Sequence, residues 1–285
     1  MHPKSRMSDD PGITPAYRKA FMTNTPRTPL DTSVPHSARV MNYWLGGKDN
    51  YPVDRALGEQ VERDFPEIVE LMRADRRFII RSVTHLAKEE GVRQFLDIGT
   101  GLPTANNTHE VAQRIAPESK IVYVDNDPLV LAHARALLTS TPEGTTDYID
   151  ADLADPEPLL AQARKHLDFS QPIGLIIMGT LGHFPADERT YAIARSYVDA
   201  LPSGSFLALC DSTDTSPQIV EAAKAWNENA AQPIYLRTKD EITAFFDGLE
   251  LLEPGVVSVP LWRPEEAEVG TAREVAQYGG IARKP

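Results

Sequence analysis

Residues 94–104, which read QFLDIGTGLPT, decide the fold of this chain. The apolar run around Asp97 is typical of a buried strand, and Gly99 and Gly101 then permit a tight turn. Because these two positions carry no side chain, a ligand can come within contact distance of the backbone. The helix expected to begin at Thr104 would aim its free N–H groups at such a ligand.

A second strand with an acidic end follows at the spacing of a nucleoside-binding unit. Residues 120–125 read KIVYVD, so an apolar strand ends in the carboxylate of Asp125, and Pro128 opens the next helix. A carboxylate in this place can accept hydrogen bonds from both ribose hydroxyls, while the preceding glycine turn admits the rest of the ligand. The two segments together predict a nucleoside site.

The identity of the nucleoside depends on the residue three positions after Gly101. A dinucleotide fingerprint requires a third glycine or a small residue there, whereas this chain has Thr104 preceded by Pro103. The pattern Asp-x-Gly-x-Gly-x-Pro is closer to the first motif of S-adenosylmethionine (SAM) methyltransferases. A third strand near 146–150 leads to Asp152, and in such enzymes this carboxylate or its neighbouring backbone meets the adenine amino group.

Strands and helices alternate from residue 93 onward, which favours an α/β fold with a mostly parallel sheet and helices on both faces. The last two expected strands, Glu253–Val259 and Ala276–Arg283, have no good helix between them and so predict a reversed edge strand. We expect a flexible leader over residues 1–33, a helical cap or lid over 34–90, and a nucleoside-binding Rossmann-like domain over 91–285.

Composition narrows the class of protein. A formal charge of −12 and a pI near 5.1 argue against a nucleic-acid or membrane-surface partner, and no apolar run approaches the ~20 residues needed to cross a bilayer. The single cysteine, Cys210, lies in an apolar strand; it cannot form an internal disulfide and fits a reducing cytoplasm. No secretory signal is visible, and His109 has no second histidine at metal-ligand spacing, so no metal site is predicted.

Three segments carry a resemblance to a known family. They are residues 31–51, which include DTSVPHSARV and LGGKDNY; residues 95–104 continued by VYVDNDP at 122–128; and residues 278–285, YGGIARKP. The chain resembles the SAM-dependent methyltransferase family Methyltransf_19, formerly DUF574. The resemblance implies a class I methyltransferase fold with a seven-stranded sheet in the order 3-2-1-4-5-7-6, and S-adenosyl-L-methionine as cofactor. It implies no particular acceptor.

Several residues are expected to hold the cofactor. Lys48 or Arg76 could neutralise the SAM carboxylate, and Tyr43 or Tyr51 could place an aromatic face against the sulfonium. The alternative for this segment is a surface turn with a core aromatic residue. The full predicted set is Asp97, Gly99, Thr100, Gly101, Asp125, Asn126, Asp152, Lys48, Arg76 and Tyr51.

His183 follows the fourth strand, where acceptors bind in this fold, and could take a proton from an acceptor because its ordinary pKa is near neutral. A single histidine is more often structural, so this catalytic role is a hypothesis. Trp44 and Trp262 could line an acceptor pocket, although packing in the core is the simpler interpretation.

The sequence therefore predicts a SAM-dependent methyltransferase of a small-molecule acceptor. Two alternatives remain at this point: a SAM-binding sensor or partner protein without turnover, and an NAD(P)-dependent or nucleotide-sugar enzyme that uses the same cradle. The acceptor atom and the oligomeric state are not readable from the sequence.

Overall fold

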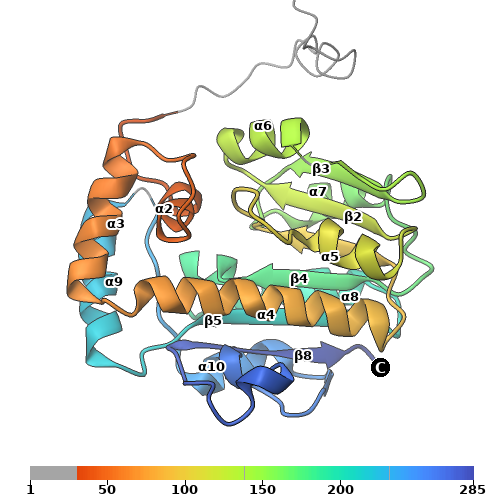
Figure 1. The fold of residues 1–285 in the computed structure, drawn as a ribbon. Coiled ribbons are helices and arrows are strands. Elements are labelled where there is room, and N and C mark those ends of the chain that lie inside the picture. Colours follow the sequence, from red (N-terminus) through yellow and green to blue (C-terminus); the bar gives the residue numbers. More distant parts are fainter. Residues whose placement is uncertain (1–30, 138, 231) are drawn as a thin grey trace, which may run out of the picture.

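The computed structural model describes residues 31–137, 139–230 and 232–285, which form a central sheet covered by helices (Figure 1). The sheet has eight strands in the order β3-β2-β1-β4-β5-β8-β6, and β7 also pairs with β8. The strands are β1 (Gln94–Ile98), β2 (Lys120–Asp125), β3 (Thr145–Asp150), β4 (Gly174–Met178), β5 (Phe206–Ser212), β6 (Glu250–Leu251), β7 (Val257–Ser258) and β8 (Gln277–Arg283). Strands β1 to β5 are parallel and β8 is antiparallel to β5, which confirms the predicted α/β class.

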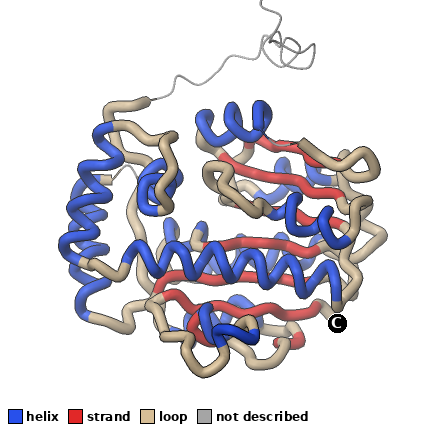
Figure 2. The backbone as a smooth tube through the Cα atoms, viewed as in Figure 1, coloured by secondary structure: helices blue, strands red, loops and turns tan. Residues whose placement is uncertain are grey.

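Helices cover both faces of the sheet and the end at which the parallel strands finish (Figure 2). They are α2 (Ser37–Trp44), α3 (Pro52–Asp64), α4 (Ile68–Lys88), α5 (Thr108–Ile115), α6 (Pro128–Leu137), α7 (Pro156–Ala163), α8 (Glu188–Ala200), α9 (Pro217–Asn229) and α10 (Lys239–Thr243). Short 3-10 turns are η1 (Thr180–His183), η2 (Ala244–Phe246), η3 (Val259–Leu261) and η4 (Glu266–Glu268).

Successive residues of the strands pack into two separate apolar clusters. Phe95 of β1 packs with residues of α4 and α5, whereas Leu96 and Ile98 pack with residues of α7 and α8 on the other face. Every residue of β1 is buried, because helices cover a parallel sheet on both sides. Trp262 lies in the first of these clusters and is fully buried, so core packing is its role.

The sixth strand of the expected sheet is split into two short pieces. β6 pairs with the end of β8 near Ala282, and β7 pairs with its middle near Gly279. The expected single strand Glu253–Val259 is therefore wrong in its bounds. Pro254 explains the break, because proline has no N–H to donate to a neighbouring strand.

The helix expected to begin at Thr104 begins instead at Thr108. Asn107 precedes it, and its Oδ1 accepts a hydrogen bond from the N–H of Thr104 at 3.0 Å. Oε2 of Glu110 accepts in turn from the N–H of Asn107 at 2.8 Å, which completes a capping box. The chain between the glycine turn and α5 is therefore an extra turn rather than helix.

Helices α2, α3 and α9 form a cap beyond the carboxyl ends of the parallel strands, on the left of Figure 1. Their apolar faces share one cluster, which includes Trp44 of α2, Leu57 and Val61 of α3, and Ile219 and Trp226 of α9. The rings of Trp44 and Trp226 lie 6.1 Å apart between centroids. The cap is thus assembled from two parts of the chain that are far apart in sequence.

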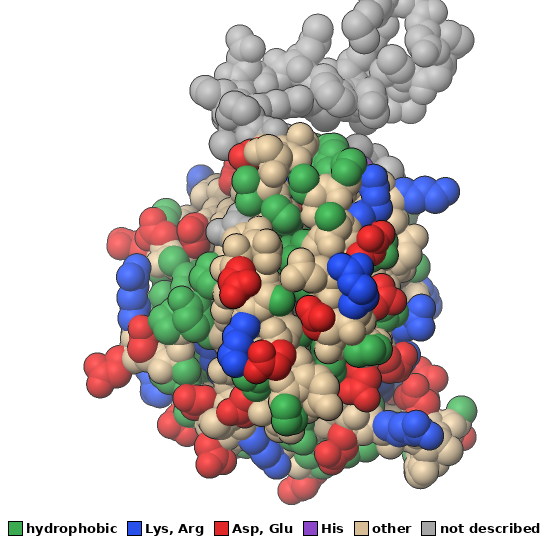
Figure 3. Space-filling model, turned by 90° about the vertical axis from the view of Figure 1, so that its left-hand side faces the viewer, with side chains coloured by type: hydrophobic (Ala, Val, Ile, Leu, Met, Phe, Trp, Pro, Cys, Tyr) green, Lys and Arg blue, Asp and Glu red, His purple; other side chains and the backbone are tan. Residues whose placement is uncertain are grey.

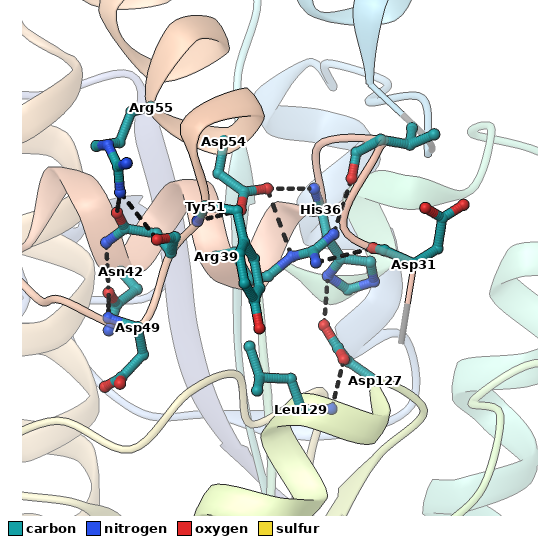
Figure 4. A network of polar contacts seen from close by, with 12 residues as sticks. Asp31, His36, Arg39, Asn42, Asp49, Tyr51, Asp54, Arg55, Asp127 and Leu129 are labelled. Atoms are coloured by element: carbon teal, nitrogen blue, oxygen red, sulfur yellow. Dashed lines mark hydrogen bonds and ion pairs between the residues drawn. The ribbon is translucent and has the colours of Figure 1, made fainter. Parts of the chain in front are cut away.

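A buried carboxylate, Asp54, joins α2 to the start of α3 (Figure 4). Its Oδ1 accepts from the N–H of His36 at 3.0 Å and lies 3.4 Å from Nε of Arg39, while its Oδ2 accepts from the N–H of Tyr51 at 2.8 Å. Arg39 is also buried, and its other nitrogens donate to the carbonyls of Asp31 and Val34. A buried ion pair is tolerated here because backbone hydrogen bonds reach both oxygens of Asp54 and both terminal nitrogens of Arg39.

A polar contact at the start of α2 joins the cap to the sheet. Nδ1 of His36 lies 3.0 Å from Oδ2 of Asp127, whose Oδ1 accepts from the N–H of Leu129 in the first turn of α6 (Figure 4). Beside this contact, Ala38 of α2 packs with Leu102 and Val130. The start of α2 is therefore fixed against the loops that follow β1 and β2.

The expected leader, residues 1–33, lies outside the described residues except for its last three. The expected boundary at residue 90 stays a prediction: α2 and α3 belong to the cap, α4 packs along the sheet, and α9 joins the cap from 217–229. Across 31–137, 139–230 and 232–285, no helix has both the length and the apolar character required to span a bilayer.

Replacing Asp54 by alanine should destabilise the protein by about 3–5 kcal/mol, because Arg39 would stay buried without its counter-charge. Chemical denaturation followed by circular dichroism measures the loss. Glu59→Ala is the matched control, since Glu59 is an exposed acid on the same helix and should change stability by under about 0.5 kcal/mol. Equal stabilities of the two variants would contradict this account of Asp54.

Candidate functional site

A cavity of about 370 Å³ lies between the carboxyl ends of the parallel strands and the cap. Residues from the strand ends line one side: Gly99, Gly101, Asp125, Asn126, Asp152, Thr180 and His183. Apolar residues from the cap and α4 line the other: Trp44, Val61, Phe65, Ile68, Met72, Ile219 and Trp226. Figure 3 looks onto the outer surface of the cap, where charged side chains of both signs surround apolar ones. The volume is in the range of ~300–1,000 Å³ that small-molecule sites occupy.

The glycine turn after β1 has the shape that the sequence predicts. Gly99 has φ +73°, and a Cβ on it would overlap the side chain of Thr180, which follows β4. Gly101 has φ +65° and open space where a Cβ would lie, and its N–H donates to Oδ2 of Asp125 at 2.9 Å. Side chains would block or strain both positions, so the turn leaves its backbone accessible from the cavity.

Asp125 lies at the end of β2 and lines the cavity. Its second oxygen, Oδ1, accepts from the N–H of Asp127 at 2.9 Å. Burial raises the pKa of the Asp125 carboxyl, and these two N–H donors oppose that effect. Each carboxylate oxygen keeps a second lone pair, so the group can still accept bonds from a ligand.

Asn126, which directly follows Asp125, and Asp152, which follows the neighbouring strand β3, also line the cavity. The side chain of Asp152 is exposed, and its Oδ1 accepts from the N–H of Ala154 at 2.8 Å. The structure therefore brings Asp125, Asn126 and Asp152 to one side of one cavity, as the sequence predicts.

Asp97 is buried and does not line the cavity. It shares a sheet face with Phe95, because side chains of a strand alternate, and Thr108 of α5 donates its hydroxyl to Oδ2 at 2.5 Å. Burial raises the pKa of Asp97 to about 6, and the nearby carboxyls of Asp125 and Asp75 act in the same direction. Its predicted contact with the cofactor stays a prediction.

Four more predicted residues lie outside the cavity lining: Thr100, Lys48, Arg76 and Tyr51. Lys48 is exposed. Nη2 of Arg76 donates to the carbonyl of Asn106 at 3.3 Å, and the ring of Tyr51 lies 5.4 Å from the Arg39 guanidinium carbon. For this set, the described contacts are those of turns and packing, and cofactor binding by them remains a prediction.

The loop before α3 is organised by Asn42 of α2. Its Oδ1 accepts from the N–H of Asp49 at 3.0 Å and from Nδ2 of Asn50 at 2.9 Å, while Arg55 donates to the carbonyl of Asn50 at 2.9 Å (Figure 4). These bonds fold the Gly-Gly-Lys segment back onto the helix that precedes it. The unusual polar composition of the loop thus has a structural explanation.

His183 in η1 lines the cavity, and one of its ring nitrogens is hydrogen-bonded to the backbone. Its Nδ1 lies 2.9 Å from the carbonyl oxygen of Pro233, and because a carbonyl only accepts, Nδ1 carries the proton. Nε2 is then the acceptor in the neutral ring. Burial lowers the pKa of His183, which favours this neutral form.

A buried arginine that the sequence analysis missed holds the loop of His183. Nη2 of Arg237 donates to the carbonyls of Leu181 and Phe184 at 2.9 and 2.8 Å, and Nη1 pairs with Oδ2 of Asp211 at 2.7 Å. Asp211 lies near the carboxyl end of β5, as Asp97 and Asp125 do in β1 and β2. The pattern of an apolar strand with an acidic end could therefore have identified it.

Asp75 and Gln277 were also missed, and both line the cavity. Asp75 lies four residues after Leu71 and four before Ile79, which places an acid on the apolar face of α4. A charged residue at such a position is unusual, and that signal was present in the sequence.

The strand order 3-2-1-4-5-8-6, with a glycine turn after β1 and an acid at the end of β2, defines the class I methyltransferase fold. The chain belongs to the S-adenosyl methyltransferase family, Methyltransf_19, whose model matches residues 23–285. This confirms the resemblance noted in the sequence, and the cofactor of the family is S-adenosyl-L-methionine.

Solved structures agree with the family. A DUF574 family protein from Streptomyces avermitilis MA-4680 is 45% identical, with 90% of this chain and 99% of that chain covered and a TM-score of 0.85. A candidate methyltransferase from Thermobifida fusca YX is 39% identical, with 92% and 99% covered and a TM-score of 0.82. Magnesium protoporphyrin IX methyltransferase from Synechocystis PCC 6803, at 12% identity, 86% and 93% coverage and a TM-score of 0.50, shares the fold alone. No curated protein matches the chain.

The raised pKa of Asp97 gives a testable pH dependence. The pKa of Asp97 is raised from its ordinary 3.8 to about 6, so between these pH values the folded chain keeps a proton that the unfolded chain releases. The stability that this proton contributes is complete below pH 4 and is lost as the pH rises through 6. Asp97→Asn removes the titration, and should make the ligand-free protein more stable than wild type by up to about 3 kcal/mol at pH 8.

Urea denaturation of both proteins from pH 4 to pH 8 measures this difference. It should be near zero at pH 4 and grow with pH, while Asp64→Asn, at an exposed position of α3, should show no such growth. An Asp97→Asn protein that is less stable than wild type at pH 8 would refute the assignment.

Proposed function

We propose that this protein transfers a methyl group from SAM to a small-molecule acceptor bound beneath the cap. One observation carries the proposal: a single cavity joins the glycine turn, Asp125 and His183 at the strand ends to an apolar chamber beneath the cap. A cofactor and an acceptor in this cavity would lie side by side and away from bulk water, which is the main requirement for transfer.

The residues of the cavity fit a cationic cofactor. Three carboxylates line it, Asp75, Asp125 and Asp152, and among the described lining residues there is no lysine or arginine. A pyrophosphate needs basic side chains or a helix N-terminus, and here α5 begins only at Thr108, after its own cap. The charge of the cavity therefore supports SAM over NAD(P), and the comparisons give the NAD(P) alternative no support.

Asp125 would accept the ribose hydroxyls, with Asn126 and Asp152 at the base and the backbone of Gly99, Thr100 and Gly101 along the rest of the cofactor. The accessible turn and the position of these side chains support this arrangement. Asp97 would act through its charge, because a bound cation nearby favours the ionised form of a buried carboxyl.

His183 would act as the proton acceptor for the acceptor molecule. SAM supplies an activated methyl group on a sulfonium, so the chain has only to orient a nucleophile and remove its proton. Nε2 of His183 is suited to this because Nδ1 is fixed by the Pro233 carbonyl and because Arg237 holds the surrounding loop. Helices α2 and α3 would serve as the lid.

The other alternative, a SAM-binding protein without turnover, differs from an enzyme in what happens after binding. Isolated protein incubated with SAM labelled in its methyl group and a small-molecule extract separates the two. Label in a small molecule other than SAM, together with release of unlabelled S-adenosylhomocysteine (SAH), supports transfer, whereas tight binding without a labelled product supports the sensor.

Asp125→Asn should weaken SAM binding at least tenfold, because charge-assisted hydrogen bonds to the ribose become neutral ones. Isothermal titration calorimetry with SAM, SAH and NAD provides the measurement. Asp150→Asn is the matched control, since Asp150 pairs with Asp125 in register at the end of β3 but is exposed and outside the cavity lining. Failure of the wild-type protein to bind SAM, or a preference for NAD, would overturn the proposal.

His183 should titrate below its ordinary 6.5 and carry its neutral proton on Nδ1. Nitrogen-15 NMR of the histidine side chains, with His183→Gln to assign the signal, reads both properties. Any measured transfer should then rise with pH through the same midpoint, because the neutral ring is the base. A proton on Nε2 in the neutral ring would exclude the proposed role.

A further inference from the structure

The cap side of the cavity is lined by apolar and aromatic side chains. Six side chains define it, which we call the acceptor chamber: Trp44, Phe65, Ile68, Met72, Ile219 and Trp226. All six belong to one buried apolar cluster contributed by α2, α9 and the chain from Phe65 into α4. A ligand in the chamber would thus be surrounded by hydrocarbon and aromatic surface.

Both tryptophans of the chamber have already used their only hydrogen-bond donor. Nε1 of Trp44 donates to the carbonyl of Gly58 at 3.1 Å, and Nε1 of Trp226 donates to the carbonyl of Gln232 at 2.8 Å. An indole has no acceptor, so these two rings can offer a ligand only apolar and π contacts. The chamber therefore selects against polar groups along most of its wall.

One carboxylate interrupts this apolar surface. Oδ1 of Asp75 accepts from Sγ of Cys210 at 2.9 Å and from Nε2 of Gln277 at 3.0 Å, and Ser212 donates to Oε1 of Gln277 at 2.8 Å. These contacts fix the orientation of Asp75 from β5 and β8. Its other oxygen, Oδ2, receives no donor from the described residues, and Asp75 lines the cavity, so Oδ2 is the atom that a ligand can reach.

The charge of the cavity disfavours an acceptor with a net negative charge. No lysine or arginine is among the described residues that line it, and burial lowers the pKa of His183, so that ring adds little positive charge near neutral pH. The imidazole of His36 is already paired with Asp127. A carboxylate or phosphate ester would have to be desolvated here without a counter-ion, which is costly.

We propose that the acceptor is an uncharged, ring-bearing apolar molecule whose hydroxyl group binds Oδ2 of Asp75. This inference rests on the proposed function and adds the substrate class. A hydroxyl suits the site because it can donate to the ionised carboxylate or accept from the protonated one. Burial raises the pKa of the Asp75 carboxyl, and a hydroxyl group can bind either form of it. The indole rings favour a flat ring system on their faces.

Three probes that share one ring system test the class: 5-indanol, indane and indane-5-carboxylate. Calorimetric titrations are made at saturating SAH, whose own affinity is measured first. We expect 5-indanol to bind at least tenfold more tightly than either of the other two. Equal binding of 5-indanol and indane, or comparable binding of the carboxylate, would overturn the inference.

Variants assign the hydroxyl contact to Asp75. Asp75→Leu should bring 5-indanol down to the affinity of indane, and Asp75→Asn, which keeps an oxygen for Cys210 and Gln277, should reduce the advantage of 5-indanol without removing it. Glu67→Gln, an exposed acid at the start of the same helix, should leave all three affinities unchanged. A full hydroxyl advantage in Asp75→Leu would refute the role of Asp75.

A further variant tests the chamber without touching the carboxylate. Ala223 lines the cavity from α9, and Ala223→Phe should fill the chamber, abolish 5-indanol binding and leave SAH affinity within twofold of wild type. Retained 5-indanol binding would place its site elsewhere and overturn the inference. Loss of SAH binding in the wild-type protein would instead count against the proposed function, so the two failures are distinguishable.

Discussion

The close approach of Thr180 to Gly99 is the constraint on which the rest of the site depends. β1 and β4 are neighbours in the sheet, and the chain leaves both strands at the same edge. Only a glycine with positive φ fits between them, because any side chain on residue 99 would overlap Thr180. The N–H of Gly101 then reaches Asp125 on β2, so one turn sets the relative positions of three strand ends.

The electrostatic character of the site follows from the same edge. Asp75, Asp97, Asp125 and Asp211 are all buried there, and burial raises the pKa of each carboxyl. Asp211 has the buried counter-charge of Arg237, whereas the cavity itself contains no lysine or arginine among the described lining residues. A site of this kind favours a ligand with a positive charge. The same excess of acid makes it a poor place for a phosphate.

The sequence was sufficient for the parallel strands of the sheet but not for every residue around the cavity. Apolar strands with acidic ends identified β1, β2 and Asp125, because strand composition and the turn that follows are local properties. Asp97 was predicted to contact the cofactor; strand alternation directs its side chain toward Thr108, and the contact stays a prediction. The start of α5 was placed too early although Asn107 and Glu110 form a legible capping box.

The acceptor chamber could not be predicted from the sequence, because Trp44 and Trp226 meet only when α9 packs against helices more than 150 residues earlier in the chain. For Lys48 and Tyr51, cofactor binding stays a prediction. Their motif is conspicuous in sequence, while its contacts in the fold are those of a helix turn.

The placement of the three tryptophans gives the protein an intrinsic optical signal. Trp44 and Trp226 line the cavity, whereas Trp262 is fully buried in the core beside Phe78. The fluorescence of Trp44 and Trp226 would therefore change when a ligand binds beneath the cap, whereas the fluorescence of Trp262 would stay constant. Changes in indole fluorescence should report occupancy of the chamber without any added dye.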